Sequence, residues 1–139
     1  MPLAWIHEDT PRWDEGKATI VGGAPAGALE VPRVVPGALA PGEWFRVEDG
    51  GRIVGYGWMD CTWGDAEVLL AVDPSCQRSG IGEFILEQLE KEAAARGLNY
   101  MLNAVRPTHP HRAGVTRWLT GRGFVPSGDG LLKRRVRRS

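Results

Sequence analysis

Apolar residues recur along residues 81–97 with the period of an amphipathic helix, which is the clearest pattern in the chain. Ile81, Ile85 and Leu89 follow one another at intervals of four residues, so they would share one face of a helix. Gly97 stands where helices commonly end in a left-handed residue. Phe84 and Leu86 widen this stripe, so the pattern predicts a helix that packs an apolar face against the rest of the domain.

Shorter segments before this helix have the patterns of β-strands. Polar and apolar residues alternate over 43–49, the Gly50–Gly51 pair suits a tight turn, and residues 52–63 would return as the partner strand of a hairpin. The run 66–72 is short and nearly all apolar, as in a strand buried on both faces. We therefore predict three consecutive strands before the helix.

The rest of the chain completes a mixed pattern. Gly55 and Gly57 interrupt the second strand, where glycine indicates a bulge or the close approach of another element. Residues 100–105 predict a strand and residues 110–123 a second helix, and short closing strands follow. Residues 21–42, rich in Gly, Pro and Ala, predict short helical turns joined by loops. Strands that alternate with helices in this way predict an α/β fold in which helices pack on one sheet.

Length and composition indicate a single domain over residues 1–139. Hydrophobic residues make up 42% of the chain and charged residues 24%, which is usual for a globular protein. No apolar run approaches the roughly 18 residues of a membrane span, and the first ten residues lack a signal-peptide pattern, so we expect a cytoplasmic protein with no membrane partner. The two cysteines form no CxxC motif, and His109 and His111 lack a third ligand, so no metal site is predicted.

Charge is distributed unevenly although the formal net charge is zero. Acids outnumber bases over residues 1–72, and the reverse holds over residues 73–139, which end in the basic run 133–138. A basic half suits a phosphate-rich ligand, either a cofactor or a nucleic acid. Because a charge run is more often a solvated face, and this one lacks interleaved aromatic residues, nucleic acid is the least favoured partner.

The stretch SCQRSGIGEF, residues 75–84, joins the apolar strand to the long helix. The first amides of a helix have no intrahelical acceptor and carry a partial positive charge, and glycine lets an anion approach them closely. The stretch is not a P-loop, which needs a following lysine, nor a Rossmann fingerprint, since Ile85 stands in place of a third glycine. Alone, it predicts a turn at a helix start that is able to bind a phosphate.

In its wider context, the segment 72–97 resembles motif A of the GNAT superfamily of acyl-CoA-dependent N-acyltransferases. That motif is a V-x-P strand end, then Q/R-x-x-G-x-G/A, then a long helix. Gln77, Gly80 and Gly82 occupy its signature positions.

Two further segments resemble the same superfamily. Residues 109–124 look like its next helix and closing Gly-Phe, and the hairpin over 46–60 looks like its second and third strands. The resemblance covers roughly residues 43–126. It implies a GNAT-type α/β fold, with a mixed, mostly antiparallel twisted sheet flanked by helices.

The resemblance also implies a ligand, acetyl-CoA, as the acyl donor. In this superfamily the loop amides hold the pyrophosphate of the donor. That role falls here on six residues, Gln77, Arg78, Ser79, Gly80, Ile81 and Gly82. The end of the preceding strand, formed by Leu70, Ala71 and Val72, would pair with the amides of the pantetheine arm as a further strand would.

Transfer of an acetyl group to an amine needs a group that accepts the proton of the amine. Glu67 is the candidate catalytic base, because it is a lone carboxylate entering an apolar strand where some superfamily members place a glutamate. Burial would raise the pKa of Glu67, as a base working near neutral pH requires. A change of register by one residue would instead turn its side chain to the other face of the sheet. The alternative to a catalytic role is an exposed acid at the start of the strand. Superfamily members often carry a tyrosine as general acid where this chain has Leu119.

The predicted activity is N-acetyltransferase activity, with direct attack of a primary amine on acetyl-CoA. The acceptor amine would belong to a small molecule, a peptide or a protein lysine, and a homodimer is left open. Four acids lie near the N-terminus: Glu8, Asp9, Asp14 and Glu15. They would suit a cationic acceptor, although a solvated face is the favoured interpretation. The alternative function is a catalytically silent GNAT-like module that binds CoA, which Leu119 favours.

Overall fold

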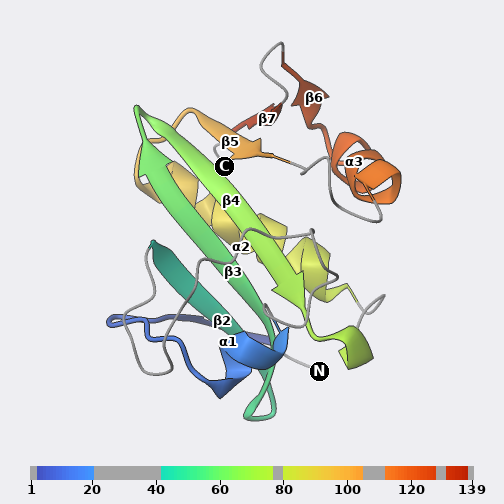
Figure 1. The fold of residues 1–139 in the computed structure, drawn as a ribbon. Helices are drawn as coiled ribbons and strands as arrows, with labels where there is room; N and C mark the ends of the chain where they lie inside the picture. Colours follow the sequence, from blue (N-terminus) through green and yellow to red (C-terminus); the bar gives the residue numbers. More distant parts are fainter. Residues whose placement is uncertain (1–2, 21–41, 77–79, 105–111, 128–130, 138–139) are drawn as a thin grey trace.

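Seven strands form one sheet in the order β1-β2-β3-β4-β5-β7-β6, and every neighbouring pair is antiparallel except β4 with β5 (Figure 1). The computed structural model describes residues 3–20, 42–76, 80–104, 112–127 and 131–137. The strands are β1 (Leu3–His7), β2 (Glu43–Asp49), β3 (Arg52–Thr62), β4 (Asp65–Val72), β5 (Tyr100–Asn103), β6 (Val125–Pro126) and β7 (Leu132–Arg135). The helices are α1 (Glu15–Ile20), α2 (Ile81–Ala95) and α3 (Arg112–Thr120), with a 3₁₀ turn at Pro74–Cys76. This architecture confirms the predicted mixed, mostly antiparallel sheet flanked by helices.

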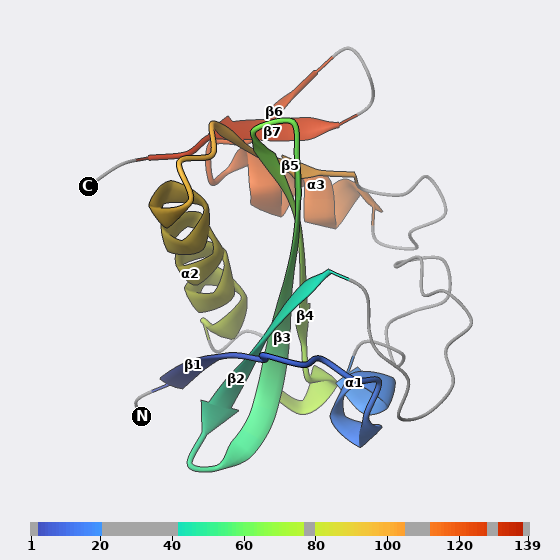
Figure 2. The ribbon, with the colours of Figure 1, turned by 90° about the vertical axis from the view of Figure 1, so that its left-hand side faces the viewer.

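Helix α2 lies close against one face of the sheet because two glycines of β3 leave room for it (Figure 2). A Cβ added at Gly55 would lie 3.0 Å from Ile85 Cδ1, and one added at Gly57 would lie 3.1 Å from Ile85 Cγ2. The predicted apolar stripe is buried, since Ile81 is 6% exposed and Ile85 and Leu89 are fully buried. The close approach predicted from the two glycines is thus confirmed.

The local turns also follow the sequence. Gly50 (φ 61°) and Gly51 (φ 86°) join β2 to β3 with two positive φ angles, as a type I′ hairpin turn requires. The β2–β3 register shifts between Val47 and Glu48, which marks a β-bulge. Gly97 (φ 70°) follows α2 in the predicted left-handed conformation.

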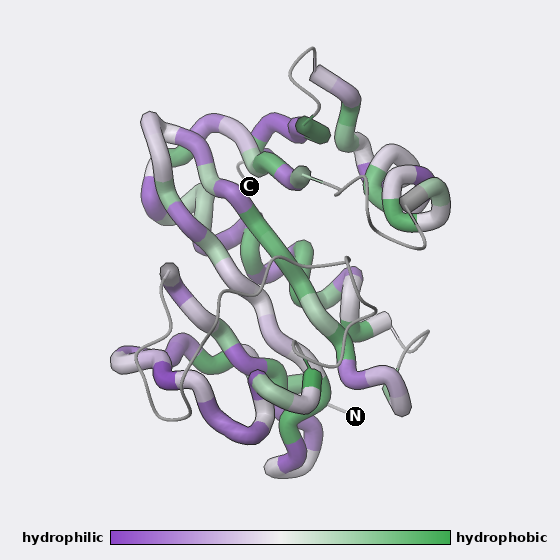
Figure 3. The backbone as a smooth tube through the Cα atoms, in the orientation of Figure 1, coloured by the Kyte–Doolittle hydropathy of each residue, from purple (hydrophilic) through white to green (hydrophobic). Residues whose placement is uncertain are grey.

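Other parts of the fold differ from the prediction. The sequence pattern predicts neither β1, which pairs with β2, nor α1, which lies on the face of the sheet opposite α2 (Figure 2). Strand β4 is not buried on both faces, because only Ala66 and Val68 are buried, although Figure 3 shows its second half as continuously hydrophobic. The predicted turns over 21–42 and the start of the predicted helix 110–123 lie almost wholly outside the described residues. No helix in the described part of the chain is long and apolar enough to cross a membrane.

Candidate active site

Strands β4 and β5 separate soon after they begin to pair, which opens a fork in the sheet. Their pairing ends at Glu67 with Leu102, whereas β4 continues to Val72. The side-chain amide of Asn103, the last residue of β5, donates a hydrogen bond to Val68 O (2.9 Å). Beyond this point, the described residues place no strand beside this edge of β4.

The open edge of β4 presents alternate backbone groups to the fork. Val68 O faces β5, whereas Asp73 N donates to a carbonyl of β3 (2.9 Å). Because backbone groups alternate sides along a strand, those of Leu70 and Val72 face the fork and those of Ala71 face β3. An edge of this kind can bind an extended, peptide-like ligand through main-chain hydrogen bonds.

The connection from β4 to α2 begins with a turn held by Asp73. Its carboxylate accepts hydrogen bonds from Ser75 N (2.9 Å) and Ser75 Oγ (2.8 Å), and Arg52 Nη2 lies 3.4 Å away. These contacts, led by the bond from the Ser75 amide, lower the pKa of Asp73. Three residues that the sequence assigns to the pyrophosphate lie outside the described residues: Gln77, Arg78 and Ser79.

Helix α2 begins with a left-handed glycine and with three amides that have no acceptor within the helix. Gly80 (φ 81°) is the N-cap, and a Cβ added there would have no heavy atom within 4 Å. The first intrahelical bond runs from Phe84 N to Gly80 O (3.0 Å), so the amides of Ile81, Gly82 and Glu83 precede the hydrogen-bonded ladder of the helix. Free amides and the positive end of the helix dipole together favour an anion at this point.

Glu67 stands where the fork opens, as the last residue of β4 that pairs with β5. Its side chain is exposed, so the predicted burial is wrong. Ala66 and Val68 belong to the core beneath α2, so Glu67 lies on the opposite face of the sheet, which is the face of α1. Asp60 of β3, also exposed, stands directly opposite it. The Glu67 carboxylate is therefore in contact with solvent at the mouth of the fork.

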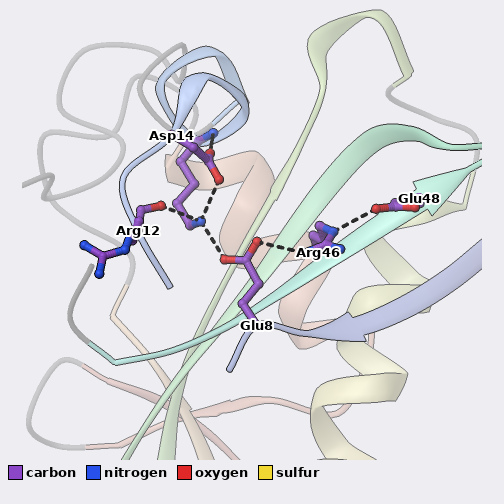
Figure 4. A network of polar contacts seen from close by, with 6 residues as sticks. Glu8, Arg12, Asp14, Arg46 and Glu48 are labelled. Atoms are coloured by element: carbon purple, nitrogen blue, oxygen red, sulfur yellow. Dashed lines mark hydrogen bonds and ion pairs between the residues drawn. The ribbon is translucent and has the colours of Figure 1, made fainter. Parts of the chain in front are cut away.

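A buried lysine anchors α1 to the same face of the sheet (Figure 4). Lys17 is 0% exposed, and its Nζ lies 2.6 Å from Glu8 Oε1, 3.2 Å from Asp14 Oδ2 and 2.8 Å from the Arg12 carbonyl oxygen. Arg46 Nη1 of β2 lies 3.3 Å from the second Glu8 oxygen. Glu8 and Asp14, two of the acids considered for a solvated face or a cationic acceptor, thus bind a cation of the protein itself.

Aromatic rings complete the environment of this lysine. Lys17 Nζ lies 5.2 Å from the ring centroid of Trp44 and 5.3 Å from that of Tyr56. Burial, followed by the negative charges of Asp14 and Glu8, raises the pKa of Tyr56. The Tyr56 hydroxyl therefore stays protonated beneath α1, and it does not lie at the fork.

Helix α3 brings a tryptophan to the first turn of α2. A Cβ added at Gly82 would lie 3.6 Å from Trp118 Cζ2 and 3.8 Å from Leu70 Cδ1, so these three residues meet beside the fork. The next residue, Leu119, is 3% exposed and packs in the core, so the position where the superfamily often has its tyrosine is directed away from solvent.

The described residues hold no group of three or more side chains that could bind a metal ion. His109 and His111 lie outside those residues.

Comparison with known proteins adds an independent observation. Residues 40–124 match the family model of the acetyltransferase (GNAT) domain. No curated protein sequence shows a significant match. The chain is similar to the solved structure of the ribosomal-protein-S18-alanine N-acetyltransferase of Escherichia coli, with 22% identity over 69% of this chain and 70% of that one and a TM-score of 0.53.

Two other solved structures align over almost the whole chain. The candidate N-acetyltransferase YhhK of Escherichia coli, bound to coenzyme A, has 15% identity and a TM-score of 0.70 over 97% of this chain and 99% of that one. N-acetylglutamate synthase of Neisseria gonorrhoeae, complexed with coenzyme A and N-acetyl-glutamate, has 20% identity and a TM-score of 0.71 over 97% of this chain. This chain spans 36% of the length of the synthase.

Proposed function

The chain belongs to the family of GNAT acetyltransferase domains, and we propose that it transfers an acetyl group from acetyl-CoA to a primary amine. The observation that carries the proposal is the open edge of β4 next to the free amides of α2. The strand edge suits a peptide-like arm, and the amides at the start of α2 suit a phosphate. Coenzyme A contains both groups in one molecule.

The residues present fit this donor. Leu70 and Val72 turn their backbone N–H and C=O groups to the fork, where the Leu70 carbonyl and both groups of Val72 would bond the amides of the pantetheine arm. The amides of Ile81 and Gly82 have no intrahelical acceptor and would bind the pyrophosphate. Gly80 leaves the approach to those amides free of a side chain.

When bound, the donor supplies a thioester carbonyl that an amine can attack. Glu67 would accept the proton of the amine through water, since its exposed carboxylate stands where the fork opens. The backbone N–H of Leu70, directed into the fork, would polarise the carbonyl. Leu119 supplies no proton to the departing thiolate, but thiols titrate at about 8.5, so the thiolate can leave without a general acid.

Two measurements test the proposal in sequence. Calorimetry first asks whether coenzyme A binds, and a thiol-detection assay then measures CoA release from acetyl-CoA with a panel of primary amines. We expect both signals, with Glu67→Gln lowering kcat by about 10²–10⁴-fold, the usual contribution of a general base. Asp60→Asn, which removes the neighbouring exposed acid of β3, is the matched control and should retain most of the activity.

The outcomes separate the proposal from its alternative. Binding without thiol release by any amine would favour the catalytically silent CoA-binding module, and a lack of binding would overturn both. Equal losses in Glu67→Gln and Asp60→Asn would remove Glu67 from the role of base.

A further inference from the structure

A cation–π pair between Trp118 of α3 and Arg122, in the turn that follows α3, lies next to the first turn of α2. The Arg122 guanidinium carbon lies 4.0 Å from the ring centroid of Trp118, and Arg122 Nη1 donates to Trp118 O (3.2 Å). The far edge of the same indole contacts Gly82, since Trp118 Cζ2 and Cη2 lie 3.6 and 3.9 Å from a Cβ added there. The indole therefore holds a guanidinium beside the amides that precede the ladder of α2.

The guanidinium is only partly engaged by the protein. Its Nε is buried without a hydrogen-bond partner among the described residues, and the side chain as a whole is 30% exposed. Its carboxylate partner, Glu83 Oε2, lies 3.7 Å away on a side chain that is 56% exposed. Exposed pairs of this kind contribute little to stability, so Arg122 can exchange this partner for a stronger anion.

We propose that Arg122, supported by the Trp118 ring, contacts the diphosphate of the acyl donor at the first turn of α2. The inference rests on the proposed function, because it assigns a further residue to the same donor site. A guanidinium binds phosphate oxygens in a planar, bidentate manner. Stacking on the indole already restricts the Arg122 side chain, so less conformational entropy is lost when it binds a phosphate. Glu83 would oppose such binding, since its carboxylate competes for Arg122 and repels the phosphate.

The first test compares donor fragments in wild type and Arg122→Gln by calorimetry, with weak ligands measured by competition. We expect Arg122→Gln to weaken CoA on the order of ten- to hundredfold, dephospho-CoA by the same factor and pantetheine not at all. Arg122→Lys should lose less than Arg122→Gln because it keeps the charge. Arg117→Gln, which removes an exposed arginine of α3, is the control and should bind CoA as wild type does.

Each other result has a distinct meaning. An equal loss for all three ligands would show that Arg122 only supports the fold, and a loss confined to CoA would assign it to the 3′-phosphate; either overturns the proposal. If wild type binds CoA and Arg122→Gln binds it equally well, this inference fails and the proposed function stands. If wild type binds no CoA, both fail.

A second pair of variants keeps the test independent of any effect of Arg122→Gln on folding. Glu83→Gln removes the competing carboxylate, so we expect CoA to bind several-fold more tightly. Glu87→Gln, one turn further along α2 and also exposed, should change the affinity less. Unchanged or weaker binding of CoA to Glu83→Gln would contradict the proposal.

Discussion

The sharpest stability prediction concerns the buried lysine beneath α1. Replacing Lys17 with Met keeps an unbranched side chain of similar length but leaves Glu8, whose side chain is 9% exposed, without its 2.6 Å partner. Breaking a buried pair by removing one ion typically costs about 3–5 kcal/mol of unfolding free energy. Arg46 remains 3.3 Å from the other Glu8 oxygen, so we expect the lower end, about 3 kcal/mol.

Urea unfolding, followed by tryptophan fluorescence, measures this cost. With a slope of about 1–3 kcal/mol per molar urea, the midpoint should fall by roughly 1–3 M. Lys91→Met, on the exposed side of α2, is the control and should change the free energy of unfolding by no more than about 0.5 kcal/mol.

A double-mutant cycle then isolates the pair. Glu8→Gln combined with Lys17→Met should cost less than the sum of the single changes, because no buried charge is left uncompensated. A loss below about 1 kcal/mol in Lys17→Met, or strict additivity of the two changes, would refute the reasoning that this pair anchors α1.

Three further predictions follow from packing and charge. Gly57→Ala should lower the free energy of unfolding by about 1–3 kcal/mol, because its Cβ would lie 3.1 Å or less from side chains of β1 and α2. Gly114→Ala, in open space on α3, is the control and should raise the free energy of unfolding by up to about 1 kcal/mol. A loss of stability in both variants would contradict the account of α2 packing. Burial alone would raise the pKa of Glu90, but hydrogen bonds from the Arg137 side chain and backbone hold it below the usual range of a glutamate. The stabilising effect of the ionised carboxylate is therefore present above the pKa of Glu90 in the unfolded chain and is lost as pH falls through the lowered pKa. Glu90→Gln should show a smaller drop in Tm between pH 7 and pH 3 than wild type, and an equal drop would count against this reasoning. Leu119→Tyr should lower Tm without raising kcat, because residue 119 is in the core, and a faster enzyme would show that this position does reach the thiolate.

The central helix and the strands around it were predictable because their signals are local. The buried face of α2 is predicted by the spacing of Ile81, Ile85 and Leu89. The surface on which α2 lies is predicted by Gly55 and Gly57. Each signal depends on spacing within a few residues, so the sequence alone carries it.

The parts that escaped prediction depend on partners far along the chain. In the sequence, Lys17 looks like any solvated lysine, because its partners Glu8 and the aromatic rings of β2 and β3 come together only in the fold. Helix α1 is anchored by this lysine and has no apolar stripe that could have predicted it. The apolar character of β4 favours a buried Glu67, but its side chain lies on the face of the sheet opposite α2, where it is exposed. Arg122 lies four residues after Trp118, a spacing that suggests contact within a helix, but nothing local shows that the indole reaches Gly82.

The most direct test of the donor site follows each backbone amide by ¹H–¹⁵N NMR while coenzyme A is added. If the fork and the start of α2 form that site, the largest shifts will be those of Leu70, Val72, Ile81 and Gly82, and the amide of Lys17 on the other face will move little. A titration that leaves these four amides unchanged, or that moves only residues elsewhere, would contradict the account.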